Sequence, residues 1–256
     1  MFSLQGKRAF VSGGSSGIGH AVAEAFIVSG AKTIIADITD GTDVARAIGA
    51  EFISVNVAEE ESVLQSLRSS TELLGGKLDI VVLNAGVGDV GPTFQQTDQA
   101  LIEKVTAINH WGVLYGLKHA PSQMNDHGSI ISTSSMAAFI QVPGAGVYSA
   151  AKRAVTSMTE TAALELGSRG IRVNAVCPGY TATALGSGEE GRTMCEAFTA
   201  LGRVAEVADM AGVYVFLASD ASRYMTGQSL KVDGGWGCGP TAKLLEMVTG
   251  DSAAPG

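Results

Sequence analysis

The sequence predicts an α/β fold: a single doubly wound domain with a parallel sheet of about seven strands and helices on both faces. Two observations lead to this prediction. Short apolar runs that suit buried strands alternate with longer amphipathic runs that suit helices, along almost all of the 256 residues. Glycine-rich or polar turns follow several of the strands, and ligands of such sheets bind at the carboxyl ends of strands.

The amino-terminal part supplies the first four strands. Lys7 to Ser12 contains the apolar run Ala9-Phe10-Val11 and stops at a glycine-rich turn. This order of strand, turn and helix favours parallel pairing through crossover helices. The further elements expected here are helices over 21–28 and 58–74 and strands over 33–37, 52–57 and 78–83.

The remaining part continues the alternation. Ile130 and Ile131 form a buried strand that leads into the hydroxyl-rich run Ser132 to Ser135. Residues 185–202 have the Gly-, Ser- and Glu-rich composition of a mobile lid, so we expect a substrate lid over about 181–203. The domain is expected to span 1–250, with a small apolar patch after Gly239 and a frayed tail over 251–256. The other expected elements are helices over 98–117, from about Val147 and over 204–217, and strands over 171–176 and 229–232.

A glycine-rich turn after the first strand indicates a dinucleotide site. The run Gly13-Gly14-Ser15-Ser16-Gly17-Ile18-Gly19 lets the backbone approach a pyrophosphate at the N-terminus of the next helix. Asp37 closes the second strand about 20 residues later, where such folds place an acid on the ribose hydroxyls. A carboxylate there would repel a 2′-phosphate, and the loop has no Arg or Lys, so NAD is favoured over NADP.

The stretch from Ser129 to Lys152 carries the candidate chemistry. Tyr148 and Lys152 are four residues apart on an expected helix and therefore share one face. A free phenol has a pKa near ~10, too high for a general base near neutrality, and a neighbouring cation would lower it. Ser135 could add a hydroxyl that holds a substrate oxygen. The three groups suit proton exchange with an alcohol or carbonyl oxygen, although a bare Tyr-x-x-x-Lys pattern also occurs in ordinary surface pairs.

Composition argues against several other classes of function. Seventeen basic residues against 25 acidic ones give a formal net charge of −8, which would repel a nucleic-acid backbone. The apolar runs are too short for a membrane span and the first residues lack a signal-peptide core, so we expect a cytoplasmic protein without a membrane partner. Three cysteines without Cys-x-x-Cys spacing and four scattered histidines suggest neither a disulfide framework nor a metal site.

Asn109 lies at the centre of the helix expected over 98–117. Asparagine has poor helix propensity, so at this place it either faces solvent or has a specific polar task. From the residue pattern alone we expect Asn109 to face solvent, and we expect His110 and Trp111 to pack rather than react.

Taken together, these motifs resemble the short-chain dehydrogenase/reductase family over nearly the whole chain. Residues 12–19 match the family's Thr-Gly-x-x-x-Gly-Ile-Gly loop with Ser in place of Thr. Leu83-Asn84-Ala85-Gly86 matches its Asn-Asn-Ala-Gly with the first Asn lost, and Val232-Asp233-Gly234-Gly235 matches the usual close of the fold. Ser135, thirteen residues before Tyr148, and Lys152, four after it, have the family's catalytic spacing. Asn56 replaces an Asp that many members place against the adenine, which leaves the adenine contact open.

This resemblance implies which residues are catalytic and which bind the cofactor. Asn109, Ser135, Tyr148 and Lys152 become the catalytic set, with Asn109 holding a water that links Lys152 to solvent. The segment Pro178 to Thr183 matches the one that grips the nicotinamide carboxamide. Family members are commonly tetramers, so a homotetramer is expected. The residues expected to bind NAD are Gly13, Ser15, Ser16, Gly17, Ile18, Gly19, Asp37, Asn56, Val57, Asn84, Ala85, Gly86, Tyr148, Lys152, Gly179, Thr181 and Thr183.

The expected activity is the reversible, NAD-dependent oxidation of a secondary alcohol to its ketone, with Tyr148 as general acid and base. The side chains expected near the substrate favour an apolar alcohol, for which cyclic and terpenoid compounds are examples. No basic cluster is evident for a CoA or carrier-protein phosphate, although Arg192 and Arg203 flank the expected lid. The residues expected to border the substrate are Met136, Phe139, Ile140, Val142, Trp111 and Leu185.

Three rival functions remain open at this point. A 3-ketoacyl reductase acting on a carrier protein or CoA thioester would share every motif, but it usually prefers NADP, which Asp37 opposes. A sugar-nucleotide epimerase should carry a larger carboxyl-terminal substrate domain than this chain has room for. A non-catalytic NAD-binding sensor would be expected to lack one of the four catalytic groups, and the sequence has all four.

Overall fold

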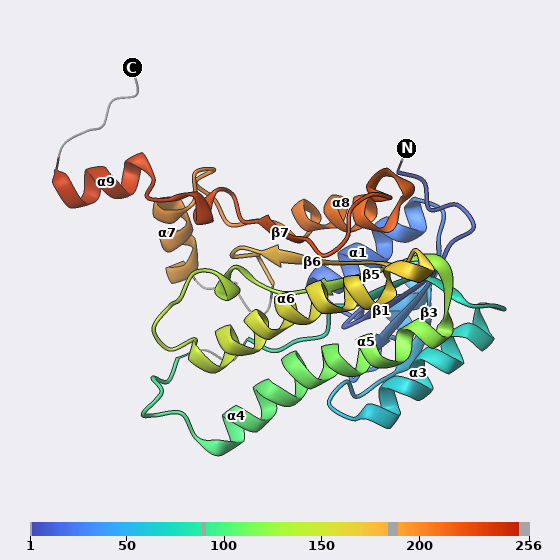
Figure 1. Ribbon diagram of the computed structural model, residues 1–256. Helices are drawn as coiled ribbons and strands as arrows, with labels where there is room; N and C mark the ends of the chain where they lie inside the picture. The colour runs from blue at the N-terminus through green and yellow to red at the C-terminus, as the bar shows by residue number, and fades with distance from the viewer. Residues whose placement is uncertain (1, 89–90, 184–188, 251–256) are drawn as a thin grey trace.

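The computed structural model describes residues 2–88, 91–183 and 189–250, and a seven-stranded sheet lies at its centre (Figure 1). The strand order is β3-β2-β1-β4-β5-β6-β7 with every neighbouring pair parallel, which confirms the predicted fold class. Chain order reverses between β1 and β4, so a crevice opens at the carboxyl ends of these strands. The strands are β1 (Arg8–Ser12), β2 (Lys32–Asp37), β3 (Glu51–Ser54), β4 (Leu78–Leu83), β5 (Met124–Thr133), β6 (Arg172–Pro178) and β7 (Ser229–Val232).

Helices cover both faces of the sheet, and a further pair of helices lies away from it (Figure 1). One face carries α1 (Gly17–Val28), α2 (Thr42–Ile48) and α8 (Val207–Ala218). The opposite face carries α3 (Glu60–Leu73), α4 (Gln99–Thr106), α5 (Gly112–Gln123) and α6 (Gly146–Leu166). The outlying pair, α7 (Glu189–Phe198) and α9 (Ala242–Thr249), pack on each other.

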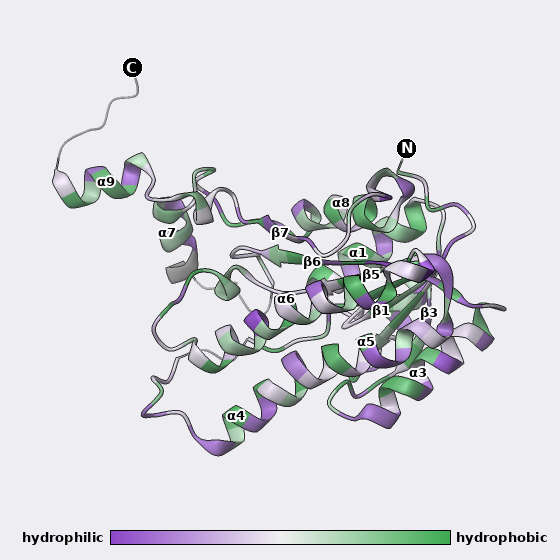
Figure 2. Cartoon of the chain, viewed as in Figure 1, coloured by the Kyte–Doolittle hydropathy of each residue, from purple (hydrophilic) through white to green (hydrophobic). Residues whose placement is uncertain are grey.

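Each face of the sheet has its own apolar core. Ile34 and Ile35 are adjacent in β2 and both fully buried, yet Ile34 packs towards α3 and α5 whereas Ile35 packs towards α1 and α8. Successive strand residues point to opposite faces, so a strand covered on both sides reads as an unbroken apolar run. Figure 2 shows this as hydrophobic strands between helices whose outer sides are hydrophilic.

Several element boundaries differ from the sequence prediction. Helix α1 begins at Gly17 rather than at residue 21, so the end of the glycine-rich turn is already helical. Helix α2 was missed because only Ala45 of its seven residues is buried, which leaves a weak apolar pattern. Strand β3 ends at Ser54 rather than at residue 57, because the Asn56 side chain accepts the Ala58 N–H at 3.2 Å and turns the chain towards α3.

The expected helix over 98–117 is interrupted and longer than predicted. A π-helical turn at Ala107–Trp111 joins α4 to α5, and α5 continues to Gln123. The segment after Gly239 was expected to be a patch followed by fraying, but Ala242–Thr249 forms α9, with Thr241 accepting the Leu244 N–H at its start. The expectation for 251–256 lies outside the described residues.

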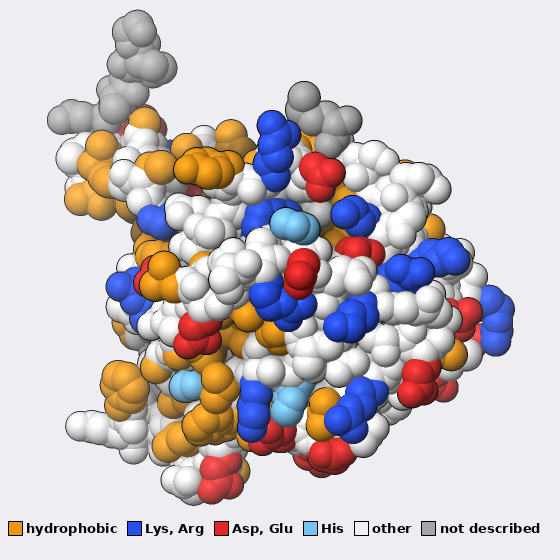
Figure 3. Space-filling model, turned by 45° about the vertical axis from the view of Figure 1, so that its right-hand side comes forward, with side chains coloured by type: hydrophobic (Ala, Val, Ile, Leu, Met, Phe, Trp, Pro, Cys, Tyr) orange, Lys and Arg blue, Asp and Glu red, His pale blue; other side chains and the backbone are white. Residues whose placement is uncertain are grey.

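The surface has mixed charge. Acidic and basic side chains are interspersed on the face shown in Figure 3. Within the described ranges, no helix is both long and apolar enough to cross a bilayer.

The packing of α1 against the sheet and α8 generates a stability prediction. Phe26 is fully buried on α1, whereas Val28 on the same helix is 83% exposed. We expect Phe26→Ala to lower the free energy of unfolding by about 3–5 kcal/mol, because it removes buried contacts and leaves a cavity. Val28→Ala, the matched control, should change it by less than about 0.5 kcal/mol. Urea unfolding of both variants measures this, and equal losses would contradict the assignment of Phe26 to the core.

Candidate active site

A cavity of about 720 Å³ opens at the carboxyl ends of the strands, at the crevice where chain order reverses. Loops that follow β1, β2, β4, β5 and β6 contribute its walls. All of the predicted catalytic and cofactor residues line this cavity except Ser15 and Gly19. The fold therefore brings together residues spread from position 13 to position 183.

The glycine-rich loop has the backbone geometry that an anion site needs. Gly13 and Gly17 have φ of +65° and +53°, in the left-handed region that favours glycine. A Cβ on Gly19 would lie only 2.0 Å from the Gly13 carbonyl oxygen, so Gly19 permits close packing rather than ligand contact. Ser16, at the N-cap of α1, makes no side-chain capping bond. The first N–H groups of α1 thus face the cavity without a side-chain acceptor.

Asp37 ends β2 at the rim of the same cavity. Its two carboxylate oxygens accept the backbone N–H groups of Ser15 at 3.2 Å and Thr39 at 3.1 Å. Ser15 therefore orients the acid instead of lining the cavity. Among the described residues that line the cavity, Lys152 is the single cation, and no Arg or Lys lies there beside Asp37.

Asn56 and Val57 also line the cavity, but the Asn56 side chain is used locally. Its amide nitrogen donates to the Glu59 carboxylate at 2.8 Å and its oxygen accepts the Ala58 N–H. This arrangement organises the turn before α3. Asn56 could contact a ligand only through the second N–H or second lone pair of its amide, or through its backbone.

Tyr148 and Lys152 lie one turn apart at the start of α6, as the spacing predicted. The Lys152 nitrogen is 5.7 Å from the centre of the Tyr148 ring and donates a hydrogen bond to the Thr133 carbonyl oxygen at 2.9 Å. Tyr148 is the third residue of α6, so the positive end of the helix dipole lies beside its phenol. Ser135 follows β5, and its hydroxyl acts on the Tyr148 phenol in the direction that lowers the phenol pKa.

The pKa values of these groups differ from the simple sequence expectation. Burial raises the pKa of the Tyr148 phenol, and the Ser135 hydroxyl offsets this only in part. The expected lowering of the Tyr148 pKa by Lys152 is therefore wrong for this arrangement, since the amine lies over the ring and bonds to Thr133. Burial lowers the pKa of Lys152 to about 8. The nearby Cys177 thiol offers little counter-charge, because burial raises its own pKa to about 11.

Asn109 is fully buried, so the expectation that it faces solvent is wrong. The π-helical turn directs its amide towards the strand ends, where it donates to the Val87 carbonyl at 2.8 Å and accepts the Val87 N–H at 3.1 Å. A Cβ on Gly86 would lie 2.7 Å from the Asn109 oxygen and 3.3 Å from the Lys152 nitrogen, so both groups face this glycine. A side chain at 86 would separate them.

The other end of the cavity is largely apolar. Of the residues predicted to border a substrate, Ile140 and Val142 line it. Three others, Met136, Phe139 and Trp111, do not line the cavity. Met136 is buried, and the cations of Arg153 and Lys231 both lie over the Phe139 ring. Trp111 stacks on Tyr115. Leu185 lies outside the described residues.

Sequence reasoning missed several residues of this apolar wall. Met194 comes from α7, and Trp236 follows the Asp233-Gly234-Gly235 turn. Both carboxylate oxygens of Asp233 accept N–H groups that flank Trp236, from Gly235 at 2.9 Å and Gly237 at 2.8 Å. No short-range pattern marks these residues, because only the folded chain brings α7 and the segment after β7 to the cavity.

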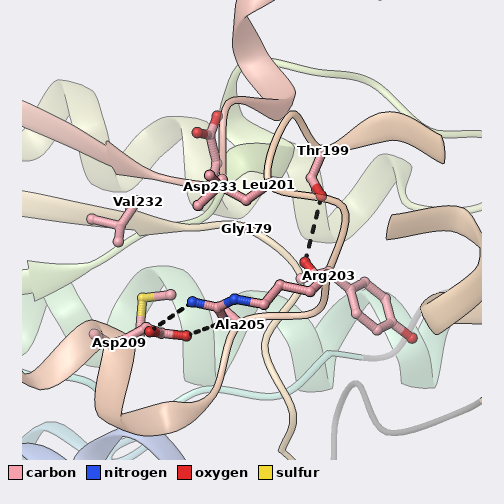
Figure 4. Close-up of a pocket in the computed structure, with 11 residues that line it drawn as sticks. Gly179, Thr199, Leu201, Arg203, Ala205, Asp209, Val232 and Asp233 are labelled. Atoms are coloured by element: carbon pink, nitrogen blue, oxygen red, sulfur yellow. Dashed lines mark hydrogen bonds and ion pairs between the residues drawn. The ribbon is translucent and has the colours of Figure 1, made fainter. Parts of the chain in front are cut away.

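The expected lid over about 181–203 is tied together at its base, beside a second cavity of about 110 Å³ (Figure 4). Ala205 donates its N–H to Tyr180 at 3.0 Å and accepts the Ala182 N–H at 2.8 Å. Arg203 donates to both carboxylate oxygens of Asp209 at 2.6 and 3.0 Å. This ion pair anchors the carboxyl end of the segment to α8. The two ends of the segment therefore meet at the body of the protein.

Comparison with known proteins shows broad similarity. A family model described as enoyl-(acyl carrier protein) reductase matches residues 13–237. The chain is 37% identical over 239 residues to a mitochondrial borneol dehydrogenase from Lavandula x intermedia, covering 91% of each protein. It is also 37% identical over 239 residues to cis-4-hydroxycyclohexanecarboxylate dehydrogenase from Sinomonas cyclohexanicum, covering 89% of this chain and 95% of that one.

Solved structures agree with this similarity. A short-chain dehydrogenase/reductase from Serratia marcescens superimposes with a TM-score of 0.86 at 32% identity, covering 91% of this chain and 99% of that one. A blue fluorescent protein from a metagenomic library, in complex with NADPH, gives a TM-score of 0.85 at 34% identity, with 91% and 99% covered. No cluster of metal-ligating side chains occurs among the described residues.

The buried amine generates a prediction about stability and pH. The pKa of Lys152 falls from 10.5 to about 8 on folding, so the unfolded chain binds more protons between these values and the free energy of unfolding rises with pH across this window. Lys152→Met should be more stable than the parent protein at pH 7.5, by roughly 1 to 2 kcal/mol. Its advantage should shrink as the pH rises towards 10.

Urea unfolding at pH 7.5, 9 and 10 measures the difference. Lys77→Met, which replaces an exposed lysine, is the matched control and should show no comparable change. A stability difference for Lys152→Met that stays constant over this range would contradict a buried amine with a lowered pKa.

Proposed function

Since the chain belongs to the short-chain dehydrogenase/reductase family, we propose that this oxidoreductase uses NAD to interconvert a secondary alcohol and its ketone. One observation carries the proposal. Ser135, Tyr148 and Lys152 line the same cavity as the glycine-rich loop and Asp37, so an acid–base group and a dinucleotide cradle share one space.

The residues present fit a nicotinamide dinucleotide. The open N-terminus of α1 suits the pyrophosphate, and the Asp37 carboxylate suits the ribose hydroxyls. Gly179, Thr181 and Thr183, which follow β6, would hold the nicotinamide end. One structural neighbour binds NADPH, and Asp37 is the reason to favour NAD over NADP here. When bound, the nicotinamide supplies the hydride chemistry.

The chain's own residues supply the proton. Because Ser135 and Tyr148 line the same cavity and the Ser135 hydroxyl acts on the Tyr148 pKa, we expect both hydroxyls to contact one substrate oxygen. In the reducing direction the neutral phenol donates its proton to that oxygen, and in the oxidising direction the phenolate accepts it. Burial raises the Tyr148 pKa, so the neutral phenol dominates near pH 7 and alkaline conditions favour oxidation.

Lys152 and Asn109 complete the catalytic set in this proposal. With a pKa of about 8, Lys152 can gain and lose a proton near neutral pH, which suits proton exchange with solvent beside Tyr148. Asn109 and Lys152 both face Gly86, a position from which Asn109 can hold a water beside the amine. These roles rest on the resemblance and on this juxtaposition.

The substrate is proposed to be an uncharged, apolar secondary alcohol. The substrate end is bordered by Ile108, Ile140, Val142, Met194 and Trp236, which carry no charge. Two relatives are named for alcohols on carbon rings, borneol and 4-hydroxycyclohexanecarboxylate. A ring-bearing alcohol fits such an apolar wall, and a carboxylate would find no described cation there other than Lys152.

The second candidate is a reductase that acts on the acyl chain of a carrier-protein or CoA thioester, as a 3-ketoacyl reductase does. The description of the matching family model, which names an acyl carrier protein, favours this class of substrate. Asp37 opposes the NADP that such reductases usually prefer. Assaying ketoacyl and enoyl thioesters beside cyclic ketones, with NADH and with NADPH, separates the two candidates. The tetramer expected from the resemblance remains a proposal.

Tyr148→Phe tests the acid–base role. We expect kcat for oxidation of secondary alcohols to fall about 10²- to 10⁴-fold, because the proton acceptor is lost while the ring keeps its packing. NADH formation measured spectrophotometrically with a panel of cyclic and acyclic alcohols checks this, and circular dichroism checks the fold. Tyr224→Phe, which alters a fully exposed phenol, should retain full activity. Substantial turnover by Tyr148→Phe would remove Tyr148 from the mechanism.

Asp37→Ser tests the cofactor preference. The parent enzyme should use NAD better than NADP, and the substitution should lower the ratio of the two kcat/KM values about tenfold or more, because the repulsion of a 2′-phosphate is lost. Asp40→Asn removes the same charge from an exposed position outside the cavity and serves as the control. A parent enzyme that uses NADP equally well would contradict the role of Asp37.

A further inference from the structure

We propose that Tyr214, a buried residue of α8, is a positioning residue for the dinucleotide site: its hydroxyl acts through Thr133 and Asn84 to hold the glycine-rich loop in its binding shape. The identity of the ligand rests on the function proposed above. The chain of contacts rests on the geometry of the described residues alone.

Four hydrogen bonds, the last two from the same amide nitrogen, connect α8 to the loop. The Tyr214 hydroxyl lies 2.7 Å from the Thr133 hydroxyl, which in turn lies 3.1 Å from the Asn84 side-chain oxygen. The Asn84 amide nitrogen donates to the carbonyl oxygens of Ser12 at 3.2 Å and Gly13 at 3.3 Å. Tyr214 is fully buried and Thr133 is 7% exposed, so water has little access to the first bond.

The direction of every bond in this series is determined by chemistry. The Ser12 and Gly13 carbonyls can only accept, so the Asn84 nitrogen must face them and its oxygen must face Thr133. That oxygen can only accept, so Thr133 gives its one hydroxyl proton to Asn84. Tyr214 must therefore donate to Thr133. Burial raises the pKa of Tyr214 well above its ordinary value, which keeps the phenol protonated and able to donate.

The end of the series is a tight fit with the loop. A Cβ on Gly13 would lie 3.0 Å from the Asn84 nitrogen, and a Cβ on Gly19 would lie 2.6 Å from it, so the amide occupies the space that these glycines leave. A turned or displaced Asn84 amide would change the loop that presents the α1 N-terminus. The Thr133 carbonyl oxygen also accepts a hydrogen bond from the Lys152 amine, so the same strand end contacts the proposed catalytic amine.

The alternative is that Tyr214 is only a core residue, since it belongs to the apolar core between the sheet and α8. If Tyr214 were only a core residue, removing its hydroxyl would lower the melting temperature without changing the affinity for a dinucleotide. The effect of removing that hydroxyl would also be independent of a substitution at Thr133. Binding and coupling measurements therefore separate the two roles.

Tyr214→Phe, Thr133→Val and Thr133→Ser test the series in the full-length chain. The dissociation constants for NAD and NADH are measured by calorimetry well below the melting temperature, and backbone amide exchange is measured over residues 13–19 without added nucleotide. We expect Tyr214→Phe and Thr133→Val each to weaken binding about 2- to 10-fold, since each removes one buried hydrogen bond. Thr133→Ser, which keeps the hydroxyl, should bind like the parent protein. Tyr224→Phe is the exposed control.

The double variant Tyr214→Phe/Thr133→Val should bind no more weakly than Thr133→Val alone, because members of one series are not additive. Amide exchange in the loop should be faster in Tyr214→Phe. Unchanged affinity in Tyr214→Phe, or fully additive effects, would overturn the proposal. If the parent protein binds no nicotinamide dinucleotide, the proposed function fails, and unchanged exchange over 13–19 then overturns the positioning role separately.

Discussion

The hydrogen bond from the buried Lys152 amine to the Thr133 carbonyl is the interaction on which the polar end of the cavity depends. It joins α6 to the carboxyl end of β5 and holds the amine one turn from Tyr148. Burying an amine without a carboxylate partner is unfavourable, and burial accordingly lowers the pKa of Lys152. A site that stability alone had shaped would carry an apolar side chain here, so the amine indicates a functional requirement.

Parallel strands make this arrangement possible. Because β1, β4 and β5 run in the same direction and lie side by side, Gly13, Asn84 and Thr133 meet at one edge although 120 residues of sequence separate the first from the last. Hydrogen bonds among these strand ends satisfy groups that leave the sheet ladder there. The polar end of the cavity is consequently built on the ends of sheet strands, whereas Met194 and Trp236 of the apolar end come from segments outside the sheet.

Burial acts in opposite directions on the two titratable groups of the site. It raises the pKa of Tyr148 above its ordinary value of 10.0 and lowers that of Lys152 from 10.5 to about 8, so the two groups lie further apart in proton affinity than they do in water. The phenol therefore keeps its proton at a pH where the amine can lose one. A carboxylate beside the amine would have fixed its charge, but the group that faces it is the neutral Cys177 thiol.

Local patterns in the sequence were enough to predict the alternation of strands and helices, the glycine-rich turn, the acid at the end of β2 and the Tyr148–Lys152 spacing, because each has a local physical cause. Only the packing of distant segments buries Asn109, since a π-helical turn redirects its amide, and only burial sets the direction of the Tyr148 pKa. The same packing selects the apolar residues that line the cavity. Desolvation and contact depend on what other segments place around a residue, and the chain written as a line does not contain that information.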